Sequence, residues 1–382
     1  MRAFVFTDKS LTRQAGRFVW LSIDTENAKN AEFLKKFPVD VWPSTFIIDS
    51  AGETAAMRWV GGASLAQIVT IFDDGERAVR ASHGGFEETL ARADRLYALG
   101  KNAEAAKSYR EAIALAPPSW PRYGRTVESL LFALESSGGN ALCATTARDA
   151  FRSLRHTASA VNVAGTGLGC AIELPANIPD RKSLIAELER DTREVMSDPK
   201  RTMPGDDRSG LYQTLISARE DAKDEAGQRQ LTREWSSFLD GEAARARTPE
   251  QRASFDSHRL GAYIALKEPQ RAIPMLEISE RELPDDYNPP ARLAVAYKEM
   301  SEWNQALAAS DRALEKAYGP RRLGILRTRA EIFQGKGDPD SAKKALEQAI
   351  AEAEALPEGQ KNPGMTASLR KKLEALEKTA TR

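Results

Sequence analysis

Apolar runs and breaker residues alternate over the first part of the chain in a way that predicts a strand followed by a helix. Residues 17–24, RFVWLSID, are rich in β-branched and aromatic side chains, which is typical of a buried strand. Residues 28–37 carry apolar side chains at mixed helical spacing, with Asn27 placed to cap the helix. Pro38 ends this helix, because proline cannot donate the next backbone hydrogen bond.

A β-hairpin and a further helix are predicted by the residues that follow. Residues 45–49, TFIID, predict a strand, and residues 54–60 predict its hairpin partner. The turn between them is Ser-Ala-Gly-Glu, in which Gly52 is free to take a positive φ. Ser64 then caps a helix whose apolar residues share one face: Leu65, Ile68, Val69 and Phe72.

In order and in element length, residues 18–75 resemble the second half of the thioredoxin fold. The specific anchors are Trp42-Pro43-Ser44-Thr45 before the strand, DSAGE at the hairpin turn, and Gly61-Gly62 before the last helix. The resemblance implies that Pro43 is a cis-proline, and that Trp42, Pro43 and Ser44 contact an extended peptide. The alternative is a trans proline at the start of a strand, which is the commoner local use of this residue.

The catalytic half of such a domain is not found in this sequence. Thioredoxin-like domains carry a Cys-x-x-Cys pair at the start of a long helix, where the helix N-terminus activates the thiolate. Here that pair and the central strand would lie upstream of Met1, which would leave two apolar strand edges without a partner. We therefore expect either a chain truncated at an internal methionine or a degenerate, non-catalytic domain that has rebuilt its sheet.

Beyond about residue 86 the apolar pattern becomes helical and repeats itself. Within residues 86–119, large, small, aromatic and turn residues stand where a tetratricopeptide repeat has them: Leu96, Gly100, Ala105, Tyr109, Ala112 and Pro117. Small side chains let two helices approach closely, and neighbouring pairs must stack because one pair cannot bury its own apolar face. Three further units follow in register: Tyr263, Ala272, Leu276 and Pro284; Tyr297, Ala306, Ser310, Ala313 and Tyr318; and Phe333, Gly337, Ala342, Leu346 and Ala349.

These resemblances predict a multidomain chain, similar to bacterial thioredoxin-family proteins with C-terminal tetratricopeptide repeats. A partial α/β thioredoxin-like domain over residues 1–80 precedes an all-α superhelix. We expect divergent repeats over 81–250, regular repeats over 251–357, and a capping helix over 358–382 with an apolar stripe of leucines. Within the divergent part, helices are predicted at residues 127–136, 141–154, 180–197, 208–222 and 225–246.

Candidate chemistry is sparse. The glycine-rich run Gly165-x-Gly167-x-Gly169 lacks a preceding strand and a following Lys-Ser pair, so it does not predict a phosphate-binding loop. Cys143 and Cys170 are 27 positions apart, and we expect two inert, partly buried thiols rather than a disulfide. We expect no catalytic residues, no metal site and no cofactor.

Charge and hydropathy narrow the classes of partner. The chain has 55 basic and 55 acidic side chains, which does not favour nucleic acid as a partner. The sequence has no run of 18 apolar residues that would predict a membrane span, and its charged N-terminus does not resemble a secretory signal. We expect a cytoplasmic protein as numbered, or a periplasmic or secreted one if a signal peptide precedes Met1.

The repeat resemblance implies a groove, lined by the first helix of each repeat, that binds a protein or an extended peptide. The groove candidates are Asp94, Tyr97, Asn288, Val295, Lys298, Arg327 and Glu331. The alternative for each is an ordinary solvated helix position. We expect a protein–protein interaction module that is redox-inactive as numbered. The alternative is a thiol–disulfide oxidoreductase whose Cys-x-x-Cys lies upstream, and only in that form would the protein be an enzyme.

Overall fold

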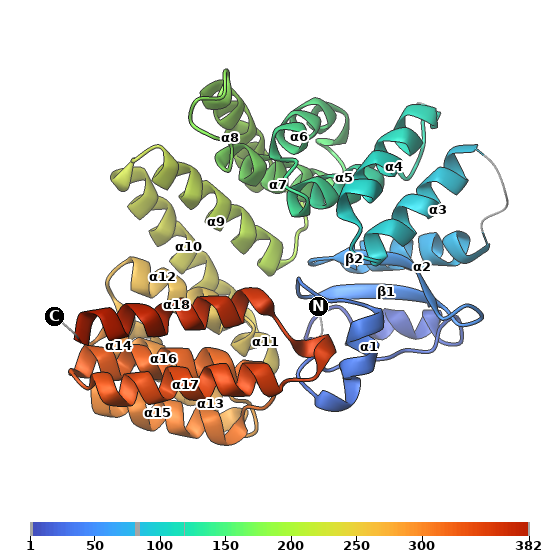
Figure 1. Ribbon diagram of the computed structural model, residues 1–382. Coiled ribbons are helices and arrows are strands. Elements are labelled where there is room, and N and C mark those ends of the chain that lie inside the picture. The colour runs from blue at the N-terminus through green and yellow to red at the C-terminus, as the bar shows by residue number, and fades with distance from the viewer. Residues whose placement is uncertain (1–2, 81–84, 118, 381–382) are drawn as a thin grey trace. The chain divides into compact units, whose positions relative to one another are not determined.

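The computed structural model describes residues 3–80, 85–117 and 119–380, and the chain forms two compact units (Figure 1). Unit 1 comprises Val39–Thr232 with the described part of Met1–Leu11. Unit 2 comprises Thr12–Pro38 with Arg233–Arg382. Helix α10 (Glu225–Arg245) contains the division between them.

Unit 1 begins with the predicted hairpin. Strand β1 (Ser44–Asp49) pairs antiparallel with β2 (Thr54–Val60), with a bulge between Ile47 and Ile48. The described residues contain no third strand, so a thioredoxin-like domain is not shown. The Trp42–Pro43 peptide bond is cis, as the resemblance implied.

The next helix of unit 1 starts as predicted. In α2 (Leu65–Arg80), the Ser64 hydroxyl accepts a hydrogen bond from the Gln67 backbone N–H, and the Gln67 side chain accepts one in return from the Ser64 backbone. Helix α2 crosses β1 closely at Gly75, where a Cβ would lie 2.5 Å from Ile47 Cγ1. Only glycine allows this approach.

The rest of unit 1 consists of helices that pack as consecutive pairs (Figure 1). They are α3 (Gly85–Ala98), α4 (Asn102–Leu115), α5 (Tyr123–Ser136), α6 (Asn140–Leu154), α7 (Ala160–Ile172), α8 (Arg181–Ser197) and α9 (Gly205–Asp221). Ala105, Tyr109 and Ala112 are completely buried, and Gly100 has a positive φ. These four residues therefore do the packing and turning that the repeat pattern predicts.

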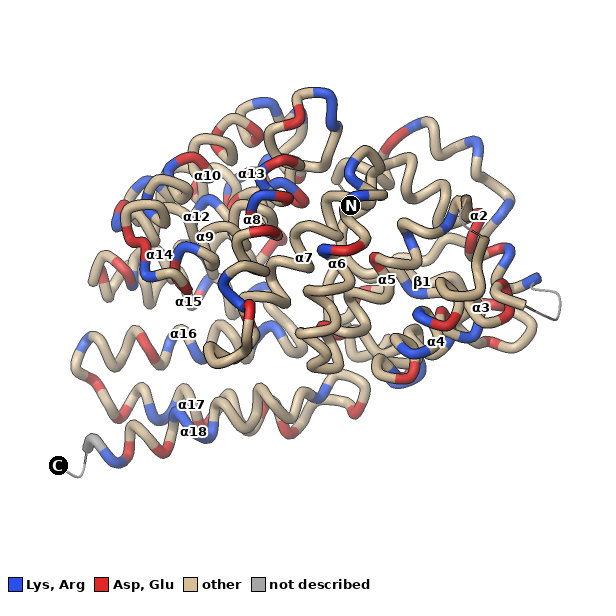
Figure 2. Tube along the Cα trace, turned by 90° about the horizontal axis from the view of Figure 1, so that it is seen from above, with Lys and Arg blue, Asp and Glu red and all other residues tan. Residues whose placement is uncertain are grey.

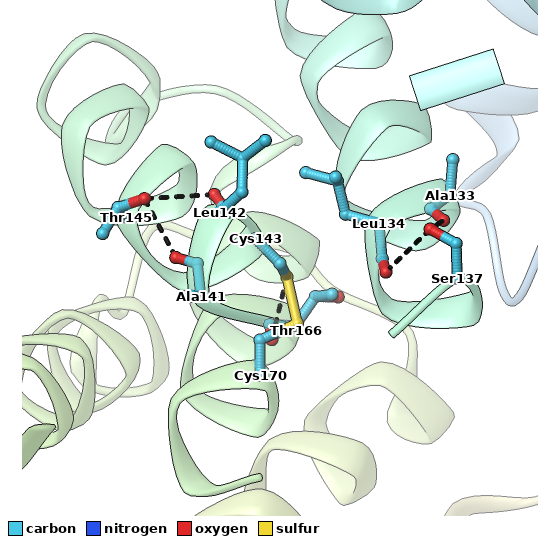
Figure 3. The surroundings of a disulfide bond; sticks show 9 residues. All are labelled: Ala133, Leu134, Ser137, Ala141, Leu142, Cys143, Thr145, Thr166 and Cys170. Carbon is cyan, nitrogen blue, oxygen red and sulfur yellow. Dashed lines mark hydrogen bonds between the residues drawn. A yellow bond between two sulfur atoms is a disulfide. The ribbon is translucent and has the colours of Figure 1, made fainter. Parts of the chain in front are cut away.

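The cysteine prediction is wrong. Cys143 in α6 and Cys170 in α7 form a disulfide with a Cα–Cα distance of 6.1 Å, and both side chains are buried (Figure 3). The glycine-rich run lies inside α7, where Gly167 allows close packing against Ala147 and Leu188. Helix packing brings the two thiols together, although their spacing alone gives no such signal.

The helices of unit 2 are α1 (Ala31–Lys36), α11 (Pro249–Ala253), α12 (Asp256–Ala265), α13 (Ala272–Glu282), α14 (Asn288–Glu299), α15 (Trp303–Lys316), α16 (Arg321–Lys336), α17 (Pro339–Ala355) and α18 (Pro363–Ala380). The predicted small packing positions are buried: Ala272, Leu276, Ala306, Ser310, Ala313, Ala342, Leu346 and Ala349. The predicted stripe of α18 also packs in the core, through Leu369 and Leu376 with Leu373 beside them.

The strand predicted at residues 17–24 is not formed. Val19 is 88% exposed and Leu21 is 70% exposed, so the apolar character of this stretch does not reflect burial. Beyond it, Asn27 caps a short 3₁₀ turn (Ala28–Asn30) that leads into α1. An apolar run of this kind needs a partner strand before it can become a buried strand.

Residues 24–31 are held by the loops between successive helix pairs of unit 2. Tyr318 donates a hydrogen bond to Asp24 (2.5 Å), and Gln360 Nε2 donates to the Thr25 carbonyl (2.9 Å). Tyr287 and Arg321 both donate to Glu26 Oε1, at 3.1 and 2.5 Å.

Close backbone approach completes this docking. A Cβ at position 319 would clash with the Glu26 carbonyl oxygen, and one at position 359 would clash with that of Ala31. Both positions are glycine, so the backbones can meet. No helix in the described part of the chain is both long and apolar enough to cross a bilayer.

Candidate functional site

Two of the predicted groove residues in unit 2 form an ion pair between helices. Lys298 on α14 donates to Glu331 on α16 (2.9 Å), and Lys372 on α18 donates to the other carboxylate oxygen of Glu331 (3.0 Å). Helices α14 and α16 are the first helices of successive pairs, and α18 follows them as the capping helix, so the contacts run across the row that was predicted to line a groove. We call Lys298, Glu331 and Lys372 the charged ladder.

The electrostatics of the ladder are mutually stabilising. Burial disfavours charge on Glu331, but the hydrogen bonds from Lys298 and Lys372 outweigh it, and the pKa of Glu331 is lowered. Burial also opposes the charge of Lys298, but Glu331 and Glu299 outweigh it and raise its pKa. Glu331 and Lys298 therefore both stay charged at neutral pH.

The other groove candidates of unit 2 are half-buried. Arg327 precedes Glu331 by about one turn of α16. Val295 is close in sequence to Lys298 on α14 and packs at the edge of the core. Asn288 opens α14 and donates a side-chain hydrogen bond to Asp286 (2.8 Å). Charged residues of both signs are interspersed along the helices (Figure 2).

In unit 1 the candidate Asp94 lies in a buried polar network. Arg125 donates two hydrogen bonds to the Asp94 carboxylate (2.6 and 3.1 Å), and Tyr109 donates a third (2.7 Å). Arg125 Nε also donates to Asp74 (3.2 Å). Asp94 is thus a buried ion-pair partner, and its side chain offers almost no surface to a ligand.

The candidate Tyr97 is buried as well. Its ring meets that of Tyr109 edge-on at 6.3 Å, and the Arg58 guanidinium lies 5.6 Å from its centre. Burial raises the pKa of Tyr97 to about 12. Both unit 1 candidates therefore contribute to the core, Asp94 through its contacts with α4 and α5, and Tyr97 where β2 packs against α3.

The three residues of the predicted peptide-contact loop lie at the start of β1. Trp42 is 55% exposed and Pro43 is exposed. Ser44 donates a hydrogen bond to the Val41 carbonyl (2.7 Å). The loop therefore presents one large apolar side chain at the surface of unit 1.

A cleft in unit 1 was not predicted from the sequence. It has a volume of about 710 Å³ and lies among β2, α2, the turn between α4 and α5, helix α5, and the turn between α6 and α7. We call it the Glu128 cleft, after the only acidic side chain in its lining. A signal was present, because Glu128 shares the helix face of Leu131 and Phe132, where an apolar residue is the usual choice.

Glu128 is 2% exposed, and burial raises its pKa to about 7. Hydrogen bonds from Ser159 and Asn162 oppose this rise, and Asn162 Nδ2 lies 2.5 Å from Glu128 Oε2. The charge of Asp207 raises the pKa further, while Arg125 lowers it. The described residues contain no group of three or more His, Cys, Asp or Glu side chains arranged to hold a metal ion.

Comparison with known proteins gives structural similarity only. Neither a family model nor a curated protein sequence matches the chain. A tetratricopeptide repeat protein from Parabacteroides merdae matches 76% of this chain and 98% of its own, with 13% identity and a TM-score of 0.45. The TPR2AB domain of yeast Sti1, solved in a complex with pHSP90, matches 78% and 98% with 15% identity and a TM-score of 0.29. A TPR protein of Thermus thermophilus, TTC0263, covers 76% and 98% with 15% identity and a TM-score of 0.25. TM-scores below 0.5 do not by themselves assign a family or a function.

Proposed function

We propose that this protein is a protein–protein interaction module that binds an extended polypeptide along the first helices of the unit 2 repeats. The observation that carries this proposal is the charged ladder, which joins α14, α16 and α18 through one shared carboxylate. The ladder side chains are between 21% and 45% exposed, so a ligand can reach them. Lys298 and Glu331 stand on helices that bury small alanines, and Lys372 stands on α18, which packs through Leu369 and Leu376.

The chemistry of this face fits a polypeptide that carries charges of both signs. Carboxylates of a partner can accept hydrogen bonds from Lys298, Lys372 and Arg327, while a basic side chain can pair with Glu331. Rigid helices hold these groups in place before binding, which reduces the ordering cost of association. Val295 and Asn288 provide apolar and amide contacts beside the ladder.

We infer that the chain has no thiol–disulfide exchange activity as numbered. Its two cysteines are paired with each other and buried between α6 and α7, where no substrate disulfide can approach a sulfur. Insulin reduction by the purified protein is therefore expected to stay at background. We further propose that Trp42, Pro43 and Ser44 form a secondary peptide-contact edge in unit 1, supported by the exposed Trp42 ring.

The main proposal can be tested with peptides selected from a random library on the full chain. Their affinities are then measured by fluorescence anisotropy against wild type, Lys298→Ala/Glu331→Ala, and a matched control. The control, Glu315→Ala/Lys344→Ala, removes the same two charges from the second helices α15 and α17. The ladder variant should bind about tenfold or more weakly, because charge-assisted hydrogen bonds contribute about 1.5–3 kcal/mol each. Equal affinity of the ladder and control variants would refute the proposal.

A further inference from the structure

The Glu128 cleft combines apolar walls with one buried acid. Aromatic and aliphatic side chains from several elements line it, including Trp59, Ile71, Trp120, Tyr123 and Leu154. Its volume of about 710 Å³ falls within the range of about 300–1,000 Å³ that is usual for ligand sites. A site of this composition favours a ligand with an apolar body and a small number of polar atoms.

Within the described residues, the hydrogen-bond donors to the Glu128 carboxylate are neutral side chains. Among the described residues no lysine or arginine forms an ion pair with it, and its identified donors are the neutral Ser159 and Asn162. The one cation in the cleft lining, Arg125, is held by Asp94 and Asp74 in the neighbouring network. The Glu128 carboxylate therefore has no ion-pair partner among the described residues that line the cleft.

The indole N–H of Trp120, also in the lining, has no hydrogen-bond acceptor among the described residues. The Trp120 side chain is 6% exposed, and its Nε1 makes no hydrogen bond within the described structure. An indole N–H can only donate, so it needs an acceptor. A buried donor left unsatisfied costs about 1–3 kcal/mol, which a ligand carbonyl in the cleft would recover.

We propose that the Glu128 cleft binds a lysine or arginine residue of a polypeptide, with the cationic side chain at Glu128 and a peptide carbonyl at Trp120 Nε1. The aliphatic stem of either residue matches the apolar walls, and the aromatic rings favour a cation in addition. Negatively charged or purely apolar ligands lack the positive charge that would pair with the Glu128 carboxylate. This site is in unit 1 and is independent of the charged ladder in unit 2.

The indole N–H of Trp120 gives a direct test by NMR on the full chain, with the signal assigned through Trp120→Phe among the six tryptophans. The probes are the N-acetyl methylamides of lysine, arginine and norleucine, of which norleucine has a lysine-like stem without the charge. We expect saturable shifts of the Trp120 signal with lysine and arginine, and binding about tenfold or more weaker with norleucine.

Two variants locate the charge effect, and each has a control. Glu128→Gln should weaken lysine binding by about tenfold or more, whereas Glu135→Gln, which changes an exposed acid of the same helix outside the cleft, should not. Thr70 is exposed in the lining, so Thr70→Arg should weaken binding without affecting the core, and Thr70→Glu should not weaken it. Any of three results would overturn the proposal. The norleucine and lysine derivatives bind with equal affinity, folded Glu128→Gln binds the lysine derivative as tightly as wild type, or the Trp120 signal shows no saturable shift with millimolar ligand.

Discussion

Reduction of the disulfide between α6 and α7 is expected to destabilise unit 1 measurably. Cys143 and Cys170 close a loop with a sequence separation of 27 residues. In the chain-entropy model, a cross-link of this length restricts the unfolded chain by about 12 cal/mol/K, which is about 3.5 kcal/mol at 25 °C. For a unit of this size, the loss corresponds to a fall in melting temperature of about 7–14 °C.

The assay follows thermal unfolding by circular dichroism with and without a phosphine reductant. Hydrogen exchange of α6 and α7 reports the effect locally, and α14 in unit 2 serves as an internal reference. The control is Cys143→Ala/Cys170→Ala, on which the reductant should have no effect. This variant should be at least as unstable as the reduced wild type, because it also loses two buried sulfur atoms.

Two results would refute the reasoning. Titration of the denatured, unreduced protein with a thiol reagent should find no free thiol, so two reactive thiols would exclude the disulfide. If the disulfide is present but its reduction shifts the melting temperature by less than about 2 °C, loop closure does not limit the unfolded chain as the entropy argument assumes.

The remaining predictions concern three acidic side chains. Asp94→Asn should lower the free energy of unfolding by about 3 kcal/mol in urea denaturation, because it removes a carboxylate from buried Arg125; a loss below about 1 kcal/mol would contradict the network. The pKa of Glu128 is about 7 in the folded protein, against an ordinary value of 4.5. The contribution of Glu128 to the free energy of unfolding is therefore fully present below about pH 4.5. It declines by about 3 kcal/mol as the pH rises through 7. Glu128→Gln should remove this decline, so comparison of the two proteins at pH 5 and pH 8 tests the sign. Glu26→Ala removes the acceptor of the hydrogen bonds from Tyr287 and Arg321, so hydrogen exchange of residues 24–36 should accelerate about fivefold while α14 stays protected. Unchanged exchange would argue against this docking.

The repeat helices could be predicted because their packing depends on local side-chain size. Ala306 and Ala342 are buried where two helices approach closely, and a larger side chain would separate them. The hairpin could be predicted for a similar reason, since its two apolar strands are neighbours in the sequence and are joined by a short turn, although the positive φ of that turn lies at Glu53 (47°) and not at Gly52. In both cases the interacting residues are close along the chain.

The strand predicted at residues 17–24 shows where this reasoning fails. Strand formation depends on a partner that can be distant in sequence, and the described residues provide none for Val19 and Leu21. The segment that follows is fixed instead by side chains far along the chain, such as Tyr318, which lies 294 positions from Asp24. No local pattern in the sequence predicts such a contact.

The predicted groove residues show the same distinction between what local pattern and what tertiary packing decide. Val295 and Glu331 occupy equivalent positions of successive repeats, and Lys298 lies about one helical turn after Val295. The repeat period therefore predicted that all three face the same row. Asp94 and Tyr97 had equivalent positions in the first repeat, but both are buried by neighbouring elements. Tyr109 of α4 and Arg125 of α5 enclose Asp94, and β2 packs against α3 with Arg58 over the Tyr97 ring. Periodicity specifies the face of a helix, whereas the neighbouring element decides whether that face meets solvent.

The sequence by itself thus determined the helical repeats, their small packing residues and the β1–β2 hairpin, because these follow from contacts at short or regular separation. Only the tertiary structure decided the Cys143–Cys170 disulfide, the docking of residues 24–31 and the Glu128 cleft. Each of these depends on groups from different elements meeting in three dimensions. Burial, which raises the pKa of Glu128 and leaves Trp120 without an acceptor, is a property of that assembly.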